Sequence, residues 1–247
     1  MNNKSTPMRA DSIDFLTGKK SGRPWPGGIS LPGKGGKFLS DGSIQLWPGN
    51  TFVRHVDAKS PEHDHLRALQ EEVKMSRFAR FFTFLPPSSF HMTVFEGVSP
   101  QATDAALLPT GTNAEMPRDA MSETMLNAVD DIRFDATQTV KMDGLFCAFS
   151  LRVSRVGEQG DLPLRAARKT LRSATGINPP GFDDYTFHIT LAYLLQWLTE
   201  PTAHALVDFS DELVMRYSQK LSAIALGPVE FCNFETMHHF EPLMRMA

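Results

Sequence analysis

The chain has 247 residues, of which 41% are hydrophobic and 21% are charged, and it carries a formal net charge of −3 at pH 7. This composition is typical of a globular protein that is long enough to bury a sizeable core. The weak negative charge argues against a protein that coats long nucleic acid electrostatically, but it leaves room for a small phosphate ligand in a locally basic cleft.

The sequence also limits where the protein can work. Residues 1–14 are polar and lack the apolar core of a signal peptide, and nowhere do 18 apolar residues follow one another. The two cysteines, Cys147 and Cys232, are too few for a disulfide scaffold and lie in apolar runs. We therefore expect a soluble, cytoplasmic monomer with buried, reduced thiols and no membrane partner.

The N-terminal part is predicted to lie outside the main domain. Residues 1–44 are expected to form an N-terminal arm and a Gly/Pro-rich loop, and 45–247 a single domain; residues 1–20 are expected to be a loose arm. The Gly-Lys-Gly-Gly-Lys sequence at 33–37 suggests a phosphate-binding loop, but it lacks the Gly-Lys-Ser/Thr ending and the flanking strand and helix.

A flexible surface loop is therefore the default interpretation of this glycine-rich segment. Its lysines, Lys34 and Lys37, could still reach over a cleft as part of a lid.

The first half of the domain is predicted to begin with a strand over residues 50–56. Ser60-Pro61 starts a helix, because serine caps the first turn and proline is tolerated in it. Residues 78–85 favour a second strand, which Pro86-Pro87 closes. After a further strand, an apolar face over residues 117–132 predicts a second helix.

The second half repeats this order. Alternating apolar residues over 145–153 predict a strand, Pro163 starts a helix that Gly176 ends, and a loop over 178–184 leads to a further strand. Three elements are predicted to close the chain: a helix over 206–217 and strands over 222–226 and 229–238.

The two halves share one short motif. Residues 90–94 and 187–191 both read Phe, His, apolar, Thr, apolar. Side chains alternate along a strand, so histidine and threonine leave one face together while their apolar neighbours leave the other. The polar residues are His91, Thr93, His188 and Thr190. The histidines are 188 − 91 = 97 residues apart, and we treat the repetition as a pattern of the whole chain.

Alternating strands and helices are compatible with a doubly wound parallel sheet. However, the sequence has no glycine-rich turn from strand to helix, and strands are expected to meet at short turns such as Pro86-Pro87 and Gly227-Pro228. We therefore predict a bilobal α+β fold with two pseudo-symmetric lobes, each a mainly antiparallel sheet with outer helices. The active-site cleft would lie between the lobes and contain both His–Thr pairs.

The tandem motif resembles that of the two-histidine (2H) phosphoesterase superfamily. Its members include bacterial RNA 2′,3′-cyclic phosphodiesterases, also called 2′-5′ RNA ligases, and plant ADP-ribose cyclic phosphodiesterases. The run His-Met-Thr-Val-Phe-Glu-Gly-Val at 91–98 is most similar to an uncharacterised branch. The resemblance covers residues 45–240 in element order. It implies a bilobal fold, a site without metal or other cofactor, and functional roles for the two histidines and two threonines.

The same chemistry follows from the residue types. Opening a cyclic phosphodiester requires a base to activate water and an acid to protonate the departing ribose oxygen. Two imidazoles with ordinary pKa values near 6.5 can share these roles near neutral pH. The threonine hydroxyls can donate hydrogen bonds to the non-bridging phosphate oxygens. Which histidine acts as the base depends on how the substrate is oriented, so both assignments stay open.

The predicted function is therefore metal-independent hydrolysis of a cyclic phosphodiester. The substrate would be a 2′,3′-cyclic nucleotide, an RNA end or an ADP-ribose cyclic phosphate. The alternative is a non-catalytic protein that binds nucleotides or RNA ends in the same cleft.

Other residues are weaker candidates. Tyr185, in a polar loop just before the second motif, is the favoured residue for stacking a base, whereas the neighbouring phenylalanines more commonly pack in a core. His63 and His65 suggest a metal site, but they lie in the first turn of a helix without the i, i+4 spacing of a ligand pair, so a solvated helix face is preferred. Three further residues could add positive charge to the site or lie on the surface: Arg54, His55 and Arg152.

Overall fold

An eight-stranded sheet forms the centre of the molecule, which the computed structural model describes over residues 5–247. Its strand order is β10-β6-β7-β8-β5-β3-β11-β12, and every neighbouring pair is antiparallel. The strands are β3 (Gly49–His55), β5 (His91–Glu96), β6 (Gln138–Phe146), β7 (Ser150–Arg155), β8 (His188–Thr190), β10 (Ile224–Leu226), β11 (Glu230–Thr236) and β12 (His239–Arg245). Together with the helices, this sheet confirms the predicted α+β class.

The seam between β5 and β8 divides the sheet into two halves of four strands each. In each half, the strand that carries a His–Thr pair lies beside an earlier strand, and a helix lies between the two along the chain. β5 pairs with β3, and β8 pairs with β7. The predicted repeat of strand, helix and His-bearing strand is therefore present. The pairing of Met92 with Ile189 across the seam joins the two lobes into one continuous sheet.

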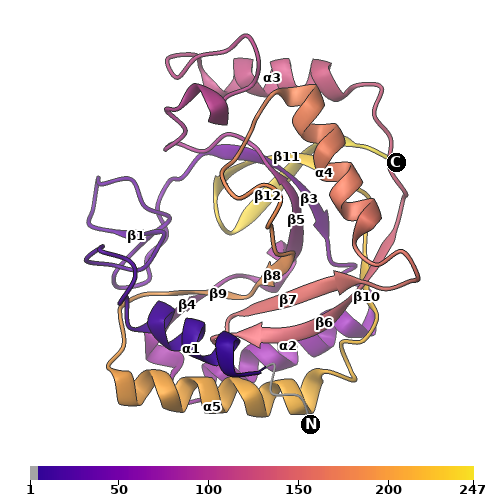
Figure 1. Cartoon of the computed structure of the whole chain (residues 1–247). Helices are drawn as coiled ribbons and strands as arrows, with labels where there is room; N and C mark the ends of the chain where they lie inside the picture. The colour runs from indigo at the N-terminus through magenta and orange to yellow at the C-terminus, as the bar shows by residue number, and fades with distance from the viewer. Residues whose placement is uncertain (1–4) are drawn as a thin grey trace.

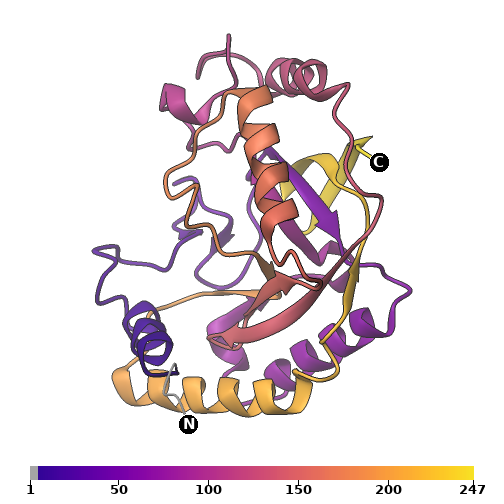
Figure 2. The same cartoon turned by 45° about the vertical axis from the view of Figure 1, so that its right-hand side comes forward.

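Helices gather at both ends of this sheet, and each half supplies a helix that packs against the other (Figure 1). Helix α2 (Pro61–Lys74) follows β3 but contacts β10, whereas α4 (Leu162–Thr175) follows β7 but contacts β5. Figure 2 shows the same division, with α3 (Arg118–Val129) near α4, and with α1 (Ser5–Leu16) and α5 (Glu200–Tyr217) at the opposite end.

The helices that link the repeated strands start and stop where the sequence predicts. The Ser60 hydroxyl accepts a hydrogen bond from the His63 backbone N–H at 3.2 Å, which caps α2. Helix α4 ends at Gly176, whose φ of 76° lies in the left-handed region. A Cβ at this glycine would lie 1.9 Å from the Thr110 hydroxyl oxygen, so both conformation and space favour glycine there.

The N-terminal segment differs from the loose arm that the sequence predicts. Residues 5–16 form α1, which packs against α5, while residues 1–4 lie outside the described part of the chain. Arg9 forms ion pairs with Asp208 and Asp211 of α5, and Leu16 is fully buried. The prediction failed because α1 lacks a strong apolar stripe and is positioned by its contacts with α5.

The Gly/Pro-rich loop contains two short parallel strands, β1 (Ile29–Ser30) and β2 (Phe38–Leu39). It packs Phe38 and Trp47 into a small core beneath the β11–β12 hairpin. The backbone N–H of Trp47, just after the loop, donates to the carbonyl of Glu235 at 2.8 Å and ties this segment to the hairpin. The division between residues 1–44 and 45–247 stays a prediction.

The single strand predicted over residues 145–153 is wrong, because this segment is the hairpin between β6 and β7. Cys147 and Ala148 occupy its turn with φ values of 53° and 63°. Phe146 pairs with Ser150, so the loop has three residues. As a result, the odd-numbered residues of β6 near the turn lie opposite odd-numbered residues of β7 and share a face with them. The alternation of apolar residues therefore continues in the sequence across the turn, and the pattern gives no sign that a turn is present.

The predicted short turns between paired strands are also wrong. β4 (Phe82–Phe84) pairs with β9 (Ala192–Leu194) in a separate two-stranded sheet, and β10 and β11 lie on opposite sides of the seam. The sequence analysis missed β12 because most of its residues are at least partly exposed at the sheet edge. The remaining elements are three short 3₁₀ helices: Ala79–Phe81, Pro87–Ser89 and Ala105–Leu107.

Two smaller expectations concern the cysteines and the membrane. Cys147 and Cys232 are both free and buried, as predicted. Within residues 5–247, no helix combines the length and the apolar character needed to cross a membrane.

Candidate active site

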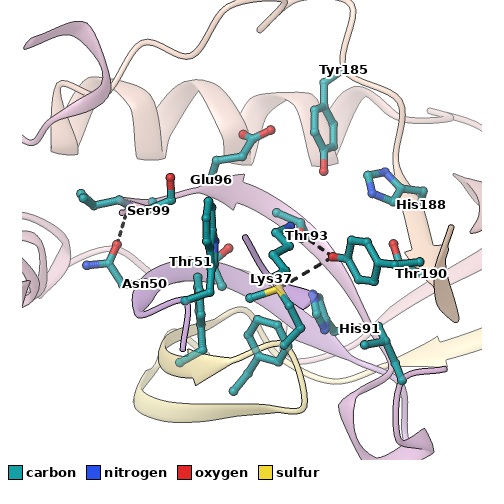
Figure 3. Close-up of a pocket in the computed structure, with 18 residues that line it drawn as sticks. Lys37, Asn50, Thr51, His91, Thr93, Glu96, Ser99, Tyr185, His188 and Thr190 are labelled. Carbon is teal, nitrogen blue, oxygen red and sulfur yellow. Dashed lines mark hydrogen bonds between the residues drawn. The ribbon is translucent and has the colours of Figure 1, made fainter. Parts of the chain in front are cut away.

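A cavity of about 340 Å³ opens at the seam of the sheet, and we call it the histidine cavity. Its lining includes all five residues that the sequence singled out, and Figure 3 shows them around one space. They are His91 and Thr93 from β5, His188 and Thr190 from β8, and Tyr185 from the loop before β8.

The two His–Thr pairs lie side by side on one face of the sheet. Met92 pairs with Ile189 in antiparallel register, so the neighbouring positions place Thr93 opposite His188 and His91 opposite Thr190. Met92 and Ile189 are fully buried on the other face, as the motif predicts. The histidines are diagonal neighbours, a relation in which residues lie roughly 7–8 Å apart, and this spacing leaves room for one phosphate group.

Both imidazoles are fixed by the same backbone contact. Nδ1 of His91 lies 2.7 Å from the carbonyl oxygen of Ser89, and Nδ1 of His188 lies 2.9 Å from that of Thr186. A carbonyl oxygen only accepts hydrogen bonds, so each Nδ1 carries the hydrogen. In the neutral ring, Nε2 therefore keeps its lone pair and can accept a proton.

The surroundings of His91 disfavour its protonated form. Its ring centroid lies 4.3 Å from that of Phe240 and 6.0 Å from that of His55. Burial lowers the pKa of His91 to about 3; the Ser89 carbonyl opposes this shift, while His55, His188 and Lys37 reinforce it. His91 is therefore neutral at pH 7 before any ligand binds.

Tyr185 rests on a buried arginine that the sequence analysis missed. The guanidinium carbon of Arg168 lies 3.8 Å from the Tyr185 ring centroid, and the Arg168 side chain is only 1% exposed. The same guanidinium donates to the carbonyl of Val94 at 2.8 Å and to the Glu96 carboxylate at 3.2 Å. Burial raises the pKa of Tyr185, so its hydroxyl keeps its proton and can donate a hydrogen bond.

Glu96 also lines the histidine cavity, although strand periodicity does not predict it. Thr93 pairs with Val53 and Phe95 pairs with Phe52, so Val94 forms a β-bulge in β5. The extra residue reverses the alternation and turns Glu96, instead of Phe95, toward the polar face.

Lys37 enters the histidine cavity from the Gly/Pro-rich loop, where the sequence suggested a lysine that might cover a cleft. Its ammonium donates to the Tyr193 hydroxyl at 3.2 Å and lies 5.0 Å from the centroid of that ring. Other walls that the sequence did not predict come from Trp47 and the β11–β12 hairpin, which supplies Phe234, Met237 and Phe240.

Several other candidates lie away from this cavity. His63 is buried, with Nε2 3.1 Å from the Pro87 carbonyl oxygen and its ring against Phe90, so the predicted solvated helix face is wrong at this position. Arg54 is buried and donates to the carbonyls of Gly227 and Asp135, and burial lowers its pKa to about 10. Arg54 is thus a structural residue.

Arg152 lies close to the histidines but on another wall. It lines a second hollow of about 420 Å³, the Arg152 hollow, which shares His188, Thr190 and Lys37 with the histidine cavity.

One group of side chains in the described residues has the composition of a metal site. The ligand atoms of His55, Glu230 and Cys232 lie within 4.8 Å of one another. However, one Glu230 carboxylate oxygen lies 2.6 Å from His55 Nδ1, and the other accepts a hydrogen bond from Arg245 at 2.9 Å. The nearby positive charge of Arg245 disfavours a cation, so this group fits a metal poorly.

The family comparison agrees with this arrangement. Residues 37–146 match the family model described as 2H-phosphodiest, a domain of unknown function (DUF1868). The matched segment includes Lys37 and the first His–Thr pair, and it confirms the predicted resemblance to the two-histidine phosphoesterase superfamily. Over this segment the chain is therefore similar to 2H-phosphodiesterase-type proteins.

Solved structures give more particular relatives. The conserved protein of unknown function ATU0111 from Agrobacterium tumefaciens strain C58 is 24% identical, with a TM-score of 0.84 over 95% of this chain and 98% of that chain. This likeness shows the fold. Usb1 from Kluyveromyces marxianus is 12% identical, with a TM-score of 0.38 over 81% of this chain and 99% of that chain. No curated protein matches the sequence significantly.

Proposed function

We propose that this protein is a metal-independent phosphoesterase that hydrolyses a cyclic phosphodiester by paired-histidine acid and base catalysis. The observation that carries the proposal is the pair of imidazoles on adjacent strands, each held through Nδ1 by a carbonyl two residues earlier. Both rings line one cavity together with two threonine hydroxyls. This arrangement suits a single phosphate group with a proton acceptor and a proton donor beside it.

The surroundings favour His91 as the base. Because His91 is neutral at pH 7, its Nε2 can take a proton from water as the water oxygen bonds to phosphorus. Protonated His188 then gives its proton to the ribose oxygen as the bond from that oxygen to phosphorus breaks. A bound phosphate also brings negative charge close to His91, and this raises its pKa toward a value at which it accepts a proton more readily.

The remaining polar groups would bind the phosphate and the sugar or base. Thr93 and Thr190 donate hydrogen bonds to the non-bridging oxygens, where charge accumulates during the reaction. Lys37 supplies a positive charge on the same wall as Tyr193. Tyr185, whose ring lies against the Arg168 guanidinium, would stack on a nucleobase.

The substrate would be a 2′,3′-cyclic nucleotide, an RNA end or an ADP-ribose cyclic phosphate. A cavity of about 340 Å³ falls in the range of small-molecule sites, and its mixture of aromatic rings, hydroxyls and cations suits a nucleotide. The alternative is a protein that binds such nucleotides in the same cavity without turnover.

One experiment separates these functions. The purified protein is incubated with 2′,3′-cyclic AMP while release of the monophosphate is followed, and binding is measured by calorimetry in the same preparation. The His91→Ala/His188→Ala double variant, purified identically, reports any contaminating phosphodiesterase. Turnover well above that of the double variant supports the enzyme. Binding with turnover no higher than that of the double variant would instead support the non-catalytic binding protein.

A further inference from the structure

The Gly/Pro-rich loop encloses a cavity of its own, which the reaction proposed above does not use. This loop cavity has a volume of about 550 Å³ and is lined mainly by residues of segment 23–37, with Trp47 and Gln101. Lys37 and Trp47 line both the loop cavity and the histidine cavity. The two spaces therefore adjoin at a lysine and an indole ring.

The charges around the loop cavity are all of one sign. Its lining includes Arg23, Lys34 and Lys37 but no carboxylate. Within the part of the chain that the structure describes, none of Arg23, Lys34 and Lys37 forms an ion pair, and the Lys37 ammonium donates a hydrogen bond to the Tyr193 hydroxyl. Unpaired cations around a concave surface, in a protein whose net charge is −3, favour an anionic ligand such as a phosphate.

The aromatic residues of the loop cavity suit a nucleobase. Trp25 packs against the core cluster that contains Trp47, yet its indole stays half-buried while Trp47 is only 6% exposed. A partly exposed ring on the wall of a cavity can stack a base, and cations nearby can hold the attached phosphate. The loop cavity therefore offers a ring that can stack on the base of a nucleotide and cations that can bind its phosphate.

The loop cavity is built by hydrogen bonds within the fold. The N–H groups of Lys37 and Phe38 both donate to the carbonyl of Gly28, at 2.7 Å and 3.1 Å, and close the loop on itself. Trp197 Nε1 donates to the carbonyl of Arg23 at 2.9 Å and ties the start of the segment to the domain. A preformed cavity loses less freedom when it binds a ligand.

We infer that the loop cavity binds a second nucleoside unit of the substrate, joined through phosphate to the ribose that carries the cyclic phosphate. This inference rests on the function proposed above and narrows its substrate class. A short RNA ending in a 2′,3′-cyclic phosphate and an ADP-ribose cyclic phosphate both have this chemistry, whereas a cyclic mononucleotide does not. The cyclic phosphate lies beside the histidines, Lys37 lies at the junction, and the second base stacks on Trp25.

The Arg152 hollow is the competing location for this unit. It adds one cation, Arg152, which lies 5.3 Å from the ring centroid of Phe146. Its phenyl rings pack against one another, with 6.0 Å between the centroids of Phe146 and Phe149. The loop cavity has more unpaired cations and an indole, and it is therefore favoured.

The test compares kcat/KM for three substrates: 2′,3′-cyclic AMP, adenylyl-adenosine 2′,3′-cyclic phosphate and an ADP-ribose cyclic phosphate. At least one of the two extended substrates should exceed the mononucleotide by roughly 10- to 100-fold, the gain expected from one stacked base. The better of the two extended substrates shows whether the second nucleoside unit belongs to an RNA or to an ADP-ribose. Equal values for all three would overturn the inference while leaving the proposed function intact.

Variants locate the second unit. Trp25→Ala should bring the ratio of extended to mononucleotide kcat/KM close to one, and Lys34→Gln should lower it several-fold. Lys59→Gln removes the same charge from an exposed position between β3 and α2 and should leave the ratio unchanged. A ratio lowered by Arg152→Gln but not by Trp25→Ala would place the unit in the Arg152 hollow and overturn the inference.

A second measurement distinguishes failure of the proposed function from failure of this inference. If none of the three substrates is turned over, calorimetry with the dinucleoside monophosphate adenylyl-(3′→5′)-adenosine and with AMP still tests the loop cavity. Tighter binding of the dinucleoside, lost in Trp25→Ala, would support the cavity without catalysis. Equal binding of both probes would overturn it.

Discussion

The histidines of the two motifs share a backbone environment but differ in what surrounds their rings. Each is held through Nδ1 by the carbonyl two residues before it. The ring of His91 lies against that of Phe240, with His55 beyond. Among residues 5–247, the ring next to His188 is that of Tyr185, with 5.9 Å between the centroids. The repeat therefore fixes where the two imidazoles lie, and other parts of the chain give the two rings different surroundings.

The source of the difference is the C-terminal hairpin. Phe240 belongs to β12, which extends the half of the sheet that carries His91 and reaches over its ring. In the other half, Arg152 of β7 lies opposite His188 in the strand register and lines the hollow beside it. In the proposed mechanism, this difference between the two flanks is what lets a nearly symmetric pair of strands supply one base and one acid.

The largest expected effect comes from removing either imidazole. His91→Ala and His188→Ala should each lower kcat roughly 100- to 10,000-fold, the usual cost of losing a general base or acid. The double variant should be scarcely worse than either single one, because the two groups act in one step. Steady-state turnover of a cyclic nucleotide measures all three variants.

His63→Ala serves as the control, since it removes a buried histidine outside the histidine cavity. Near-normal turnover in a folded variant of either motif histidine would contradict the paired-imidazole mechanism. It would leave the chemistry to other residues or the cavity to binding alone.

A smaller loss is expected from the threonines. Thr93→Ala or Thr190→Ala removes one hydrogen bond to a charged phosphate, worth about 1.5–3 kcal/mol, so kcat/KM should fall about 10- to 100-fold. Thr→Ser at the same position keeps the hydroxyl and should restore most of the activity. A serine variant as impaired as the alanine variant would point to packing by the methyl group, not to hydrogen bonding.

The difference between the flanks predicts a pH effect. With a pKa near 3, His91 is already almost fully deprotonated at pH 5, so its protonation should not lower kcat/KM of the free enzyme above that pH. Phe240→Leu admits water to the ring and should raise the pKa of His91 toward 6.5. Activity at pH 5 relative to pH 7.5 should then fall about tenfold for each unit by which the pKa comes to exceed 5.

The pH profile of kcat/KM measures this shift. Leu243→Ala is the control, because it changes a more exposed apolar residue of the same strand. An unchanged profile in folded Phe240→Leu would mean that Phe240 does not set the proton affinity of His91.

The smallest expected effect is that of a chelator. In the proposed mechanism two imidazoles supply both proton transfers, so turnover should be unchanged by EDTA. Loss of activity that one particular metal restores would contradict this expectation and would direct attention to His55, Glu230 and Cys232.

The sequence predicted the parts of the site that follow strand and helix periodicity. The His–Thr positions depend only on alternation along a strand, and the helix boundaries at Ser60 and Gly176 depend on local capping chemistry. Tyr185 was found because of its place before the motif, and it does line the cavity.

The rest depends on tertiary arrangement, which periodicity does not encode. Glu96 faces the cavity because of a bulge, and Lys37 reaches it because a distant loop packs beneath the C-terminal hairpin. Arg168 enters from α4, a helix that follows the other half of the sheet. The turn at Cys147 and Ala148 could not be predicted, because apolar residues alternate in the sequence without a break across it.

The exchange of helices between the halves has a consequence for folding. Helix α4 contacts β5 and α2 contacts β10, so each half completes its core only with a helix from the other. Arg168 would lose its acceptor at Val94 if the chain were divided between the halves. We therefore expect that neither half would fold on its own, because separating them would remove a helix from the surface that it covers.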